Sequence, residues 1–174
     1  MWRWLIDQVR AAFDLPPKTA PAVPFRHPVY GELSEDRSNP GFHAPVKVDW
    51  QGAPIDFRPD ASFGTRGCGA VIDEACFATL DALLADQSGW HLQLKTAVLA
   101  EVYPIYLEDW RNPDEGSALS DEAFWSHLAL ESVSTYGSGE FSFVLYMDEE
   151  IPTGHVIDAS GSIEDGFTDV ALSS

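Results

Sequence analysis

The spacing of apolar residues changes once along this chain, near residue 128, and this change constrains the fold more than any other feature. Between residues 71 and 128, apolar side chains recur every three or four positions, as on one face of a helix. After residue 128 they alternate with polar side chains in four short segments: Leu130–Tyr136, Phe141–Tyr146, His155–Ala159 and Phe167–Leu172. This order predicts helices followed by an antiparallel meander of three or four strands.

Three helices are expected in the first of these regions. One begins at Val71 directly after a glycine-rich stretch, and a second is capped by Ser88 and continues until Pro104. A short third helix follows Ser120, which is a suitable N-cap residue.

The region before the helices has the pattern of short strands. Pro28–Leu33 is a candidate first strand. Residues 46–50 and 55–57 alternate on either side of Gln51-Gly52, which predicts a hairpin. The fold class is therefore expected to be α+β, a mostly antiparallel sheet with two or three helices packed on one face.

The first 24 residues differ from the rest of the chain. Residues 1–14 have the spacing of an amphipathic helix of mixed charge, and residues 15–24 contain four prolines and predict a stiff linker. The expected organisation is an N-terminal helix, the linker, and one α+β domain over residues 25–174, which suits a chain of 174 residues.

The charge of the chain is strongly negative and unevenly placed. The formal net charge is −18, and the last 74 residues hold sixteen Asp and Glu against one base, Arg111. Such a field repels nucleic acid and anionic membranes and attracts basic surfaces. No uninterrupted apolar segment is long enough to span a membrane, and no secretory signal is visible, so a cytoplasmic protein with free thiols is expected.

Candidate catalytic and metal patterns are weak in this sequence. The glycines of residues 64–69 match neither a dinucleotide fingerprint nor a P-loop, and the carboxylate clusters lack calcium-loop spacing. Cys76 falls on the apolar stripe of a helix, whereas Cys68 lies beside Arg66, which could favour a thiolate. We expect no cofactor, no metal and no catalytic residue. The alternatives are a small hydrolytic enzyme that uses the Cys68 loop or a carboxylate pair, and an adaptor module tethered by the N-terminal helix.

Four segments carry a resemblance to a known group of proteins: HPVYGEL at 27–33, VDWQGAPIDF at 48–57, IDEACFATLDALLAD at 72–86 and IPTGHVID at 151–158. Over residues 25–172 the chain resembles small bacterial domains of unknown function that are often associated with immunity proteins of toxin systems. The resemblance implies a fold and a broad role, and it carries over no site residue.

Charge and resemblance together predict a non-catalytic immunity protein that binds a basic toxin domain and occludes its active site or substrate cleft. Neither the toxin's identity nor the oligomeric state follows from the sequence. The expected partner-binding residues are the acids of three segments together with one tryptophan: Asp109, Trp110, Asp114, Glu115, Asp148, Glu149, Glu150, Glu164 and Asp165. Trp110 is expected in an exposed acidic loop, where it could anchor a partner or fill the core.

Overall fold

A computed structural model describes residues 24–34, 36, 43–59, 61–62, 71–110, 118–137, 139–148, 151 and 155–173. The chain divides into two compact units, one made of Met1–Ala44 with Ala61–Val71 and the other of Pro45–Asp60 with Ile72–Ser174. The expected N-terminal helix and the linker up to residue 23 lie outside the described residues. The two units are described separately below.

The smaller unit contains a short hairpin in which β1 (Phe25–His27) pairs with β2 (Gly31–Leu33). The prediction of one continuous strand over Pro28–Leu33 is wrong, because Pro28–Tyr30 form a turn. The His27 ring explains this turn: its Nδ1 accepts the N–H of residue 29 at 3.2 Å and that of residue 30 at 3.3 Å. Two further short strands, β5 (Ala61–Ser62) and β6 (Val71–Ile72), pair with each other.

The larger unit is built on a six-stranded sheet with the order β10-β9-β8-β7-β4-β3. The strands are β3 (Val46–Trp50), β4 (Ala53–Pro59), β7 (Leu128–Thr135), β8 (Glu140–Met147), β9 (Val156–Ser162) and β10 (Gly166–Ser173). The predicted meander is confirmed, since β7 to β10 pair antiparallel in sequence order. The parallel pairing of β4 with β7 joins the meander to the β3–β4 hairpin, and no local pattern predicted it.

The hairpin predicted around Gln51-Gly52 is confirmed, since β3 pairs antiparallel with β4. Gln51 and Gly52 both have positive φ, 53° and 86°, as a two-residue connection of this kind requires. The glycine tolerates this conformation without steric cost. The α+β fold class is thus confirmed for the described part of the chain.

The described residues of the larger unit form four helical segments beside the sheet: α2 (Ala75–Ala85), α3 (Gln87–Ile105), the π-helical η1 (Tyr106–Trp110) and α4 (Asp121–Ser126). The first helix starts four residues later than predicted, because residues 71–72 pair as a strand and the Asp73 carboxylate accepts the Ala75 N–H at 2.9 Å. The carboxylate of Asp86, and not Ser88, caps α3 by accepting the Gly89 N–H.

The structure confirms the predicted start of the third helix but not the predicted end of the second. The predicted cap at Ser120 is confirmed, since its hydroxyl oxygen accepts the Ala123 N–H at 3.2 Å. The predicted helix end at Pro104 is wrong, because α3 includes this proline and continues into η1. A proline removes one backbone donor and crowds the preceding turn, and the wider π geometry begins two residues after it.

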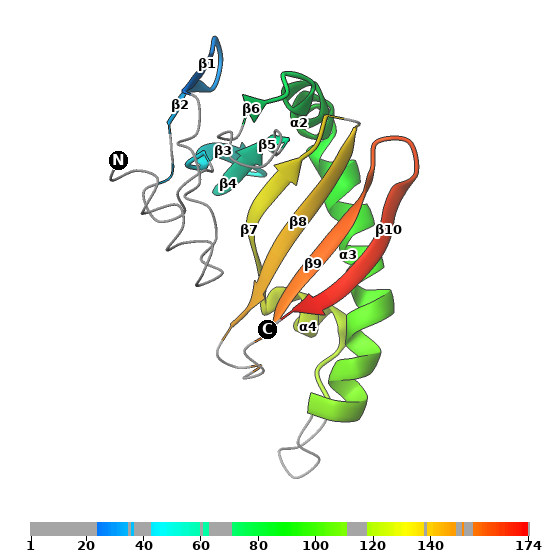
Figure 1. The fold of residues 1–174 in the computed structure, drawn as a ribbon. Coiled ribbons are helices and arrows are strands. Elements are labelled where there is room, and N and C mark those ends of the chain that lie inside the picture. The colour runs from blue at the N-terminus through cyan, green and yellow to red at the C-terminus, as the bar shows by residue number, and fades with distance from the viewer. Residues whose placement is uncertain are drawn as a thin grey trace, which may run out of the picture. The chain divides into compact units, whose positions relative to one another are not determined.

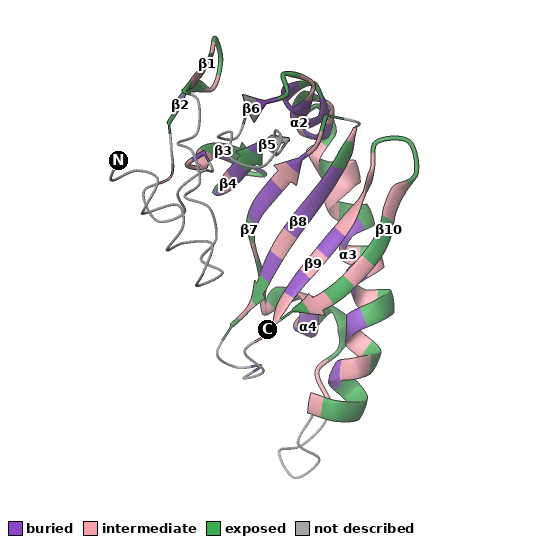
Figure 2. Cartoon of the chain, viewed as in Figure 1, coloured by how far each residue is buried: buried purple, intermediate pink, exposed green. Residues whose placement is uncertain are grey.

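Among the described residues of the larger unit, the helices lie on one face of the sheet, and no helix of this unit lies on the other face (Figure 1). Along β8 the side chains of Phe141, Phe143 and Leu145 are buried, whereas Glu140 and Tyr146 on the opposite face are exposed (Figure 2). The Trp90 ring of α3 meets the Phe141 ring edge-on at 5.2 Å, which identifies the buried face as the helix side. The surface on the opposite side of β7–β10 is called the open face below.

None of the helices in the described segments combines the length and the apolar character needed to cross a membrane.

Candidate functional site

The larger unit carries a negative charge that its own basic side chains do not offset. Its described residues include eighteen carboxylates and three bases. Lys47 and Arg58 lie 2.6 and 3.8 Å from the Asp56 carboxylate, and Lys95 lies 2.5 Å from Glu122. Because every described base of this unit already has a carboxylate beside it, the field around the unit is strongly negative and attracts cations.

The first predicted acidic segment begins in η1, with Asp109 and Trp110. Trp110 is half-buried, and its ring stacks on that of His155 with the centroids 5.7 Å apart and an interplanar angle of 20°. The prediction of a loop at Trp110 is therefore wrong, since this residue ends a helical segment. Asp109 is exposed beside it, whereas Asp114 and Glu115 lie outside the described residues.

The second predicted acidic segment begins directly after β8. The Asp148 carboxylate lies 2.8 Å from Nδ1 of His127, and the Asp148 N–H donates to the carbonyl oxygen of the same histidine at 3.0 Å. These contacts hold the histidine ring in one orientation. Glu149 and Glu150 lie outside the described residues.

The structure brings these two segments to the same end of the sheet. His155 precedes β9 and Asp148 follows β8, and these two strands pair antiparallel from Tyr146 and Val156 onward. Neither His127 nor His155 was predicted as part of a site. Both histidines lie at strand or helix ends, and sequence spacing alone does not reveal which acid or ring they will meet.

The third predicted segment lies at the opposite end of the sheet. Glu164 and Asp165 are exposed in the turn between β9 and β10, one strand length from Asp148 (Figure 1). Seven to eight residues of strand span roughly 25 Å. The predicted residues that the structure describes thus form two groups at the two ends of one sheet, not a single cluster.

Polar side chains on the open face connect the two ends. The Ser142 hydroxyl donates to the Asp158 carboxylate at 2.5 Å between β8 and β9. Near the first end, the charge of Glu131 and a hydrogen bond to it raise the pKa of Tyr146 above 10.0, and Arg58 acts in the opposite direction. This tyrosine is 45% exposed and presents its ring to solvent.

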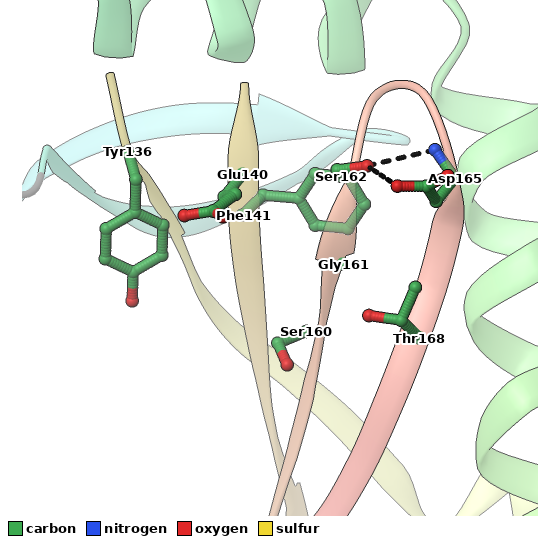
Figure 3. A pocket seen from close by; sticks show the side chains of 8 residues that line it. All are labelled: Tyr136, Glu140, Phe141, Ser160, Gly161, Ser162, Asp165 and Thr168. Carbon is green, nitrogen blue, oxygen red and sulfur yellow. Dashed lines mark hydrogen bonds between the residues drawn. The ribbon is translucent and has the colours of Figure 1, made fainter. Parts of the chain in front are cut away.

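A pocket of about 310 Å³ lies at the Glu164–Asp165 end (Figure 3). Its walls come from β8, β9, β10, the turn between β9 and β10, and the residue after β7: Tyr136, Glu140, Phe141, Ser160, Gly161, Ser162, Asp165 and Thr168. The Ser162 hydroxyl donates to the Asp165 carboxylate at 3.0 Å and accepts the Asp165 N–H at 2.9 Å. We call this cavity the β9–β10 pocket. The only one of its lining residues that the sequence analysis selected is Asp165.

Of the two cysteines, the structure describes one. Cys76 is a free, fully buried thiol in α2, as its place on the apolar stripe predicted, and Cys68 lies outside the described residues. Within the described ranges, no three His, Cys, Asp or Glu side chains are grouped so as to hold a metal ion.

Comparison with curated proteins and with solved structures finds no match. A family model described as an uncharacterised protein conserved in bacteria matches residues 27–172. This range includes β2, both ends of the sheet and the β9–β10 pocket, and it agrees with the expected likeness to a small bacterial domain of unknown function. The chain therefore belongs to the DUF2262 family of uncharacterised proteins conserved in bacteria.

Proposed function

We propose that this chain is a non-catalytic immunity-type protein that binds a basic toxin domain and covers its active site or substrate cleft. The observation that supports this role is the uncompensated charge of the larger unit, whose three described bases all lie beside carboxylates. A partner that acts on nucleic acid needs a basic substrate surface, and an acidic protein can occupy that surface.

The contact surface that we propose is the open face with its two acidic ends. A standard interface buries about 800 Å² on each partner, which corresponds to a patch roughly 28 Å across. The open face spans roughly 25 Å along its strands. One partner can therefore reach Asp109, Trp110 and Asp148 at one end and Glu164 and Asp165 at the other.

This arrangement favours fast association. Complementary charge raises the association rate constant from roughly 10⁵–10⁶ M⁻¹s⁻¹ for a neutral pair toward 10⁸–10⁹ M⁻¹s⁻¹ at low salt. An inhibitor of a toxin needs this speed, because the toxin acts as soon as it is free.

The first experiment identifies the partner. The tagged chain serves as bait in lysate of its native host at about 50 mM and at about 500 mM salt, since the higher concentration shortens the screening length to well under 10 Å. The expected result is one basic protein retained at both salts in a stoichiometric amount. Retention of nothing, or of many basic proteins at low salt only, overturns the proposal.

The second experiment locates the surface with matched variants. Glu131 and Glu140 are exposed acids of β7 and β8 on the open face, and Asp81 and Glu101 are exposed acids of the helix layer. Reversal of the open-face pair to lysine is expected to lower the association rate constant about tenfold or more at low salt. Reversal of the helix pair, which changes the net charge equally, is expected to have a smaller effect. Equal effects of the two pairs would exclude the open face as the contact surface.

A further inference from the structure

We propose that the β9–β10 pocket binds the guanidinium group of an arginine side chain. This inference deepens the proposed function and rests on it where the arginine belongs to the basic partner. The pocket itself is lined by residues of three neighbouring strands, by Asp165 in the turn between β9 and β10, and by the adjoining Tyr136.

The two turns beside the pocket are tied to each other. The Ile163 N–H in the β9–β10 turn donates to the carbonyl oxygen of Gly139 in the β7–β8 turn at 3.0 Å. The Tyr136 N–H donates to the carbonyl oxygen of Glu140 at 2.9 Å, so these two lining residues face each other across the β7–β8 hairpin. The walls on both sides are therefore held in place before a ligand arrives, which lowers the entropic cost of binding.

An irregularity in β10 shapes the third wall. The register between β9 and β10 shifts between Phe167 and Asp169, so that Thr168 is an extra residue in the strand. A bulge of this kind redirects a side chain, and here the Thr168 side chain lines the pocket (Figure 3). A Cβ atom on Gly161 would lie 2.0 Å from the carbonyl oxygen of Gly166, so only glycine permits this close approach of the two strands.

The side chains that line the pocket favour a positively charged ligand. The pocket offers the carboxylates of Glu140 and Asp165 and the hydroxyls of four further residues, and none of the described residues that line it is basic. Among the described residues, no basic nitrogen lies within 4 Å of either carboxylate. Two carboxylates repel a phosphate or another anion and attract a positive group.

The volume of the pocket and the ring of Tyr136 favour a planar cation. A volume of about 310 Å³ is at the lower limit of roughly 300–1,000 Å³ for ligand pockets, which suits one side chain and not a nucleotide. The Tyr136 ring forms one wall beside Glu140 (Figure 3). A guanidinium group is planar, so it can bind a carboxylate with two parallel hydrogen bonds and stack on an aromatic ring. An ammonium group is not planar and can do neither.

The test uses small probes and the intact chain. N-acetyl-arginine amide is titrated into the labelled protein and the backbone amide shifts are followed by NMR. The neutral isostere N-acetyl-citrulline amide and the cation N-acetyl-lysine amide are titrated in parallel. We expect saturable shifts at Tyr136, Glu140 and Ser160 with the arginine probe, no saturable shift with citrulline, and clearly weaker binding of lysine. Equal binding of lysine, or shifts spread evenly over the acidic surface, overturns the assignment.

Three variants sharpen this test. Glu140→Gln removes one of the two carboxylates of the pocket and is expected to weaken binding of the arginine probe about tenfold or more. Tyr136→Leu removes the stacking surface and is expected to weaken the arginine probe more than the lysine probe. Glu101→Gln makes the same change at an exposed residue of α3 that does not line the pocket, and it is expected to bind the arginine probe as the unmodified chain does. Equal weakening by Glu140→Gln and Glu101→Gln overturns a specific pocket.

The outcomes for the pocket and for the proposed function are separate. A chain that retains a basic protein at both salts but shows no saturable arginine binding keeps the proposed function and loses the pocket. A chain that binds the arginine probe in the pocket but retains no partner loses the immunity role and keeps the site.

Discussion

His127 is attached to Asp148 at two points, once through its ring and once through its backbone. Its Nδ1 lies 2.8 Å from a carboxylate oxygen of Asp148, and its carbonyl oxygen accepts the Asp148 N–H at 3.0 Å. These contacts join the residue after α4 to the residue after β8. An acid selected from the sequence for partner binding therefore also secures one end of the sheet.

This relationship predicts the effect of substitutions at Asp148. Asp148→Ala removes the side-chain contact and is expected to lower the free energy of unfolding by about 1 kcal/mol, since the histidine side chain is 17% exposed and the aspartate 47%. Asp148→Asn keeps an acceptor oxygen and is expected to cost less. Urea unfolding of the two variants measures the difference. Equal losses would show that the charge, and not the hydrogen bond, provides the stabilisation.

The stack of Trp110 on His155 leads to a second prediction. Trp110→Ala removes a ring contact between η1 and the start of β9 and is expected to cost about 0.5–1.5 kcal/mol beyond the area it exposes. Amide hydrogen exchange at residues 106–110 is expected to accelerate in the same variant. Trp110→Phe keeps an aromatic ring and serves as the control. Unchanged exchange in the alanine variant would show that the stack does not hold η1.

The close approach of β9 and β10 makes Gly161 intolerant of a side chain. In Gly161→Ala the new Cβ would lie 2.0 Å from a backbone oxygen, so one of the strands must move. We expect a loss of more than about 2 kcal/mol in the free energy of unfolding, as for other overpacked sites. Ser160→Ala, in the neighbouring residue, is the control and is expected to cost less. A fully stable Gly161→Ala chain would contradict the observed strand spacing.

His91 makes the stability of the larger unit depend on pH. Burial, and to a smaller extent the charge of Lys95, lower the pKa of His91 below 6.5. The unfolded chain therefore binds a proton at a higher pH than the folded chain does, and stability is lost as the pH falls from 6.5 through the lowered pKa. Within the described residues, Nδ1 of His91 is buried and has no hydrogen-bond partner.

The measurement compares the unmodified chain with His91→Gln. The free energy of unfolding of the unmodified chain is expected to fall more steeply than that of the variant between about pH 7 and about pH 5. The difference between the two slopes isolates His91 from the carboxylates, which titrate in both proteins. Identical slopes would show that burial does not disfavour the charged form of this ring.

Local patterns in the sequence predicted the elements whose residues interact with near neighbours. The β3–β4 hairpin needs only an alternating pattern and a Gln51-Gly52 turn, and the meander needs four such patterns with reversals between them. The cap at Ser120 and the burial of Cys76 follow from the same local rules. The start of α2 was misplaced because residues 71–72 have the spacing of a helix but find a strand to pair with.

One signal for the β9–β10 pocket was present in the sequence. The apolar positions of the last strand are Phe167, Val170 and Leu172, so the alternation breaks once, at the position where the structure has its bulge. A break in a two-residue period indicates an extra residue in the strand. The sequence did not indicate that this residue would face Tyr136 and Glu140.

The sequence by itself determined the fold class, the order of helices and strands, and the negative charge, because these depend on composition and on spacing within a few residues. The tertiary structure alone decided the parallel pairing of β4 with β7, the contacts of His127 and His155, and the separation of the acids into two ends. The strand pairing and the histidine contacts join residues that are at least 21 positions apart in the chain. Such contacts depend on how whole elements pack together, and the identity of the individual residues carries little information about that packing.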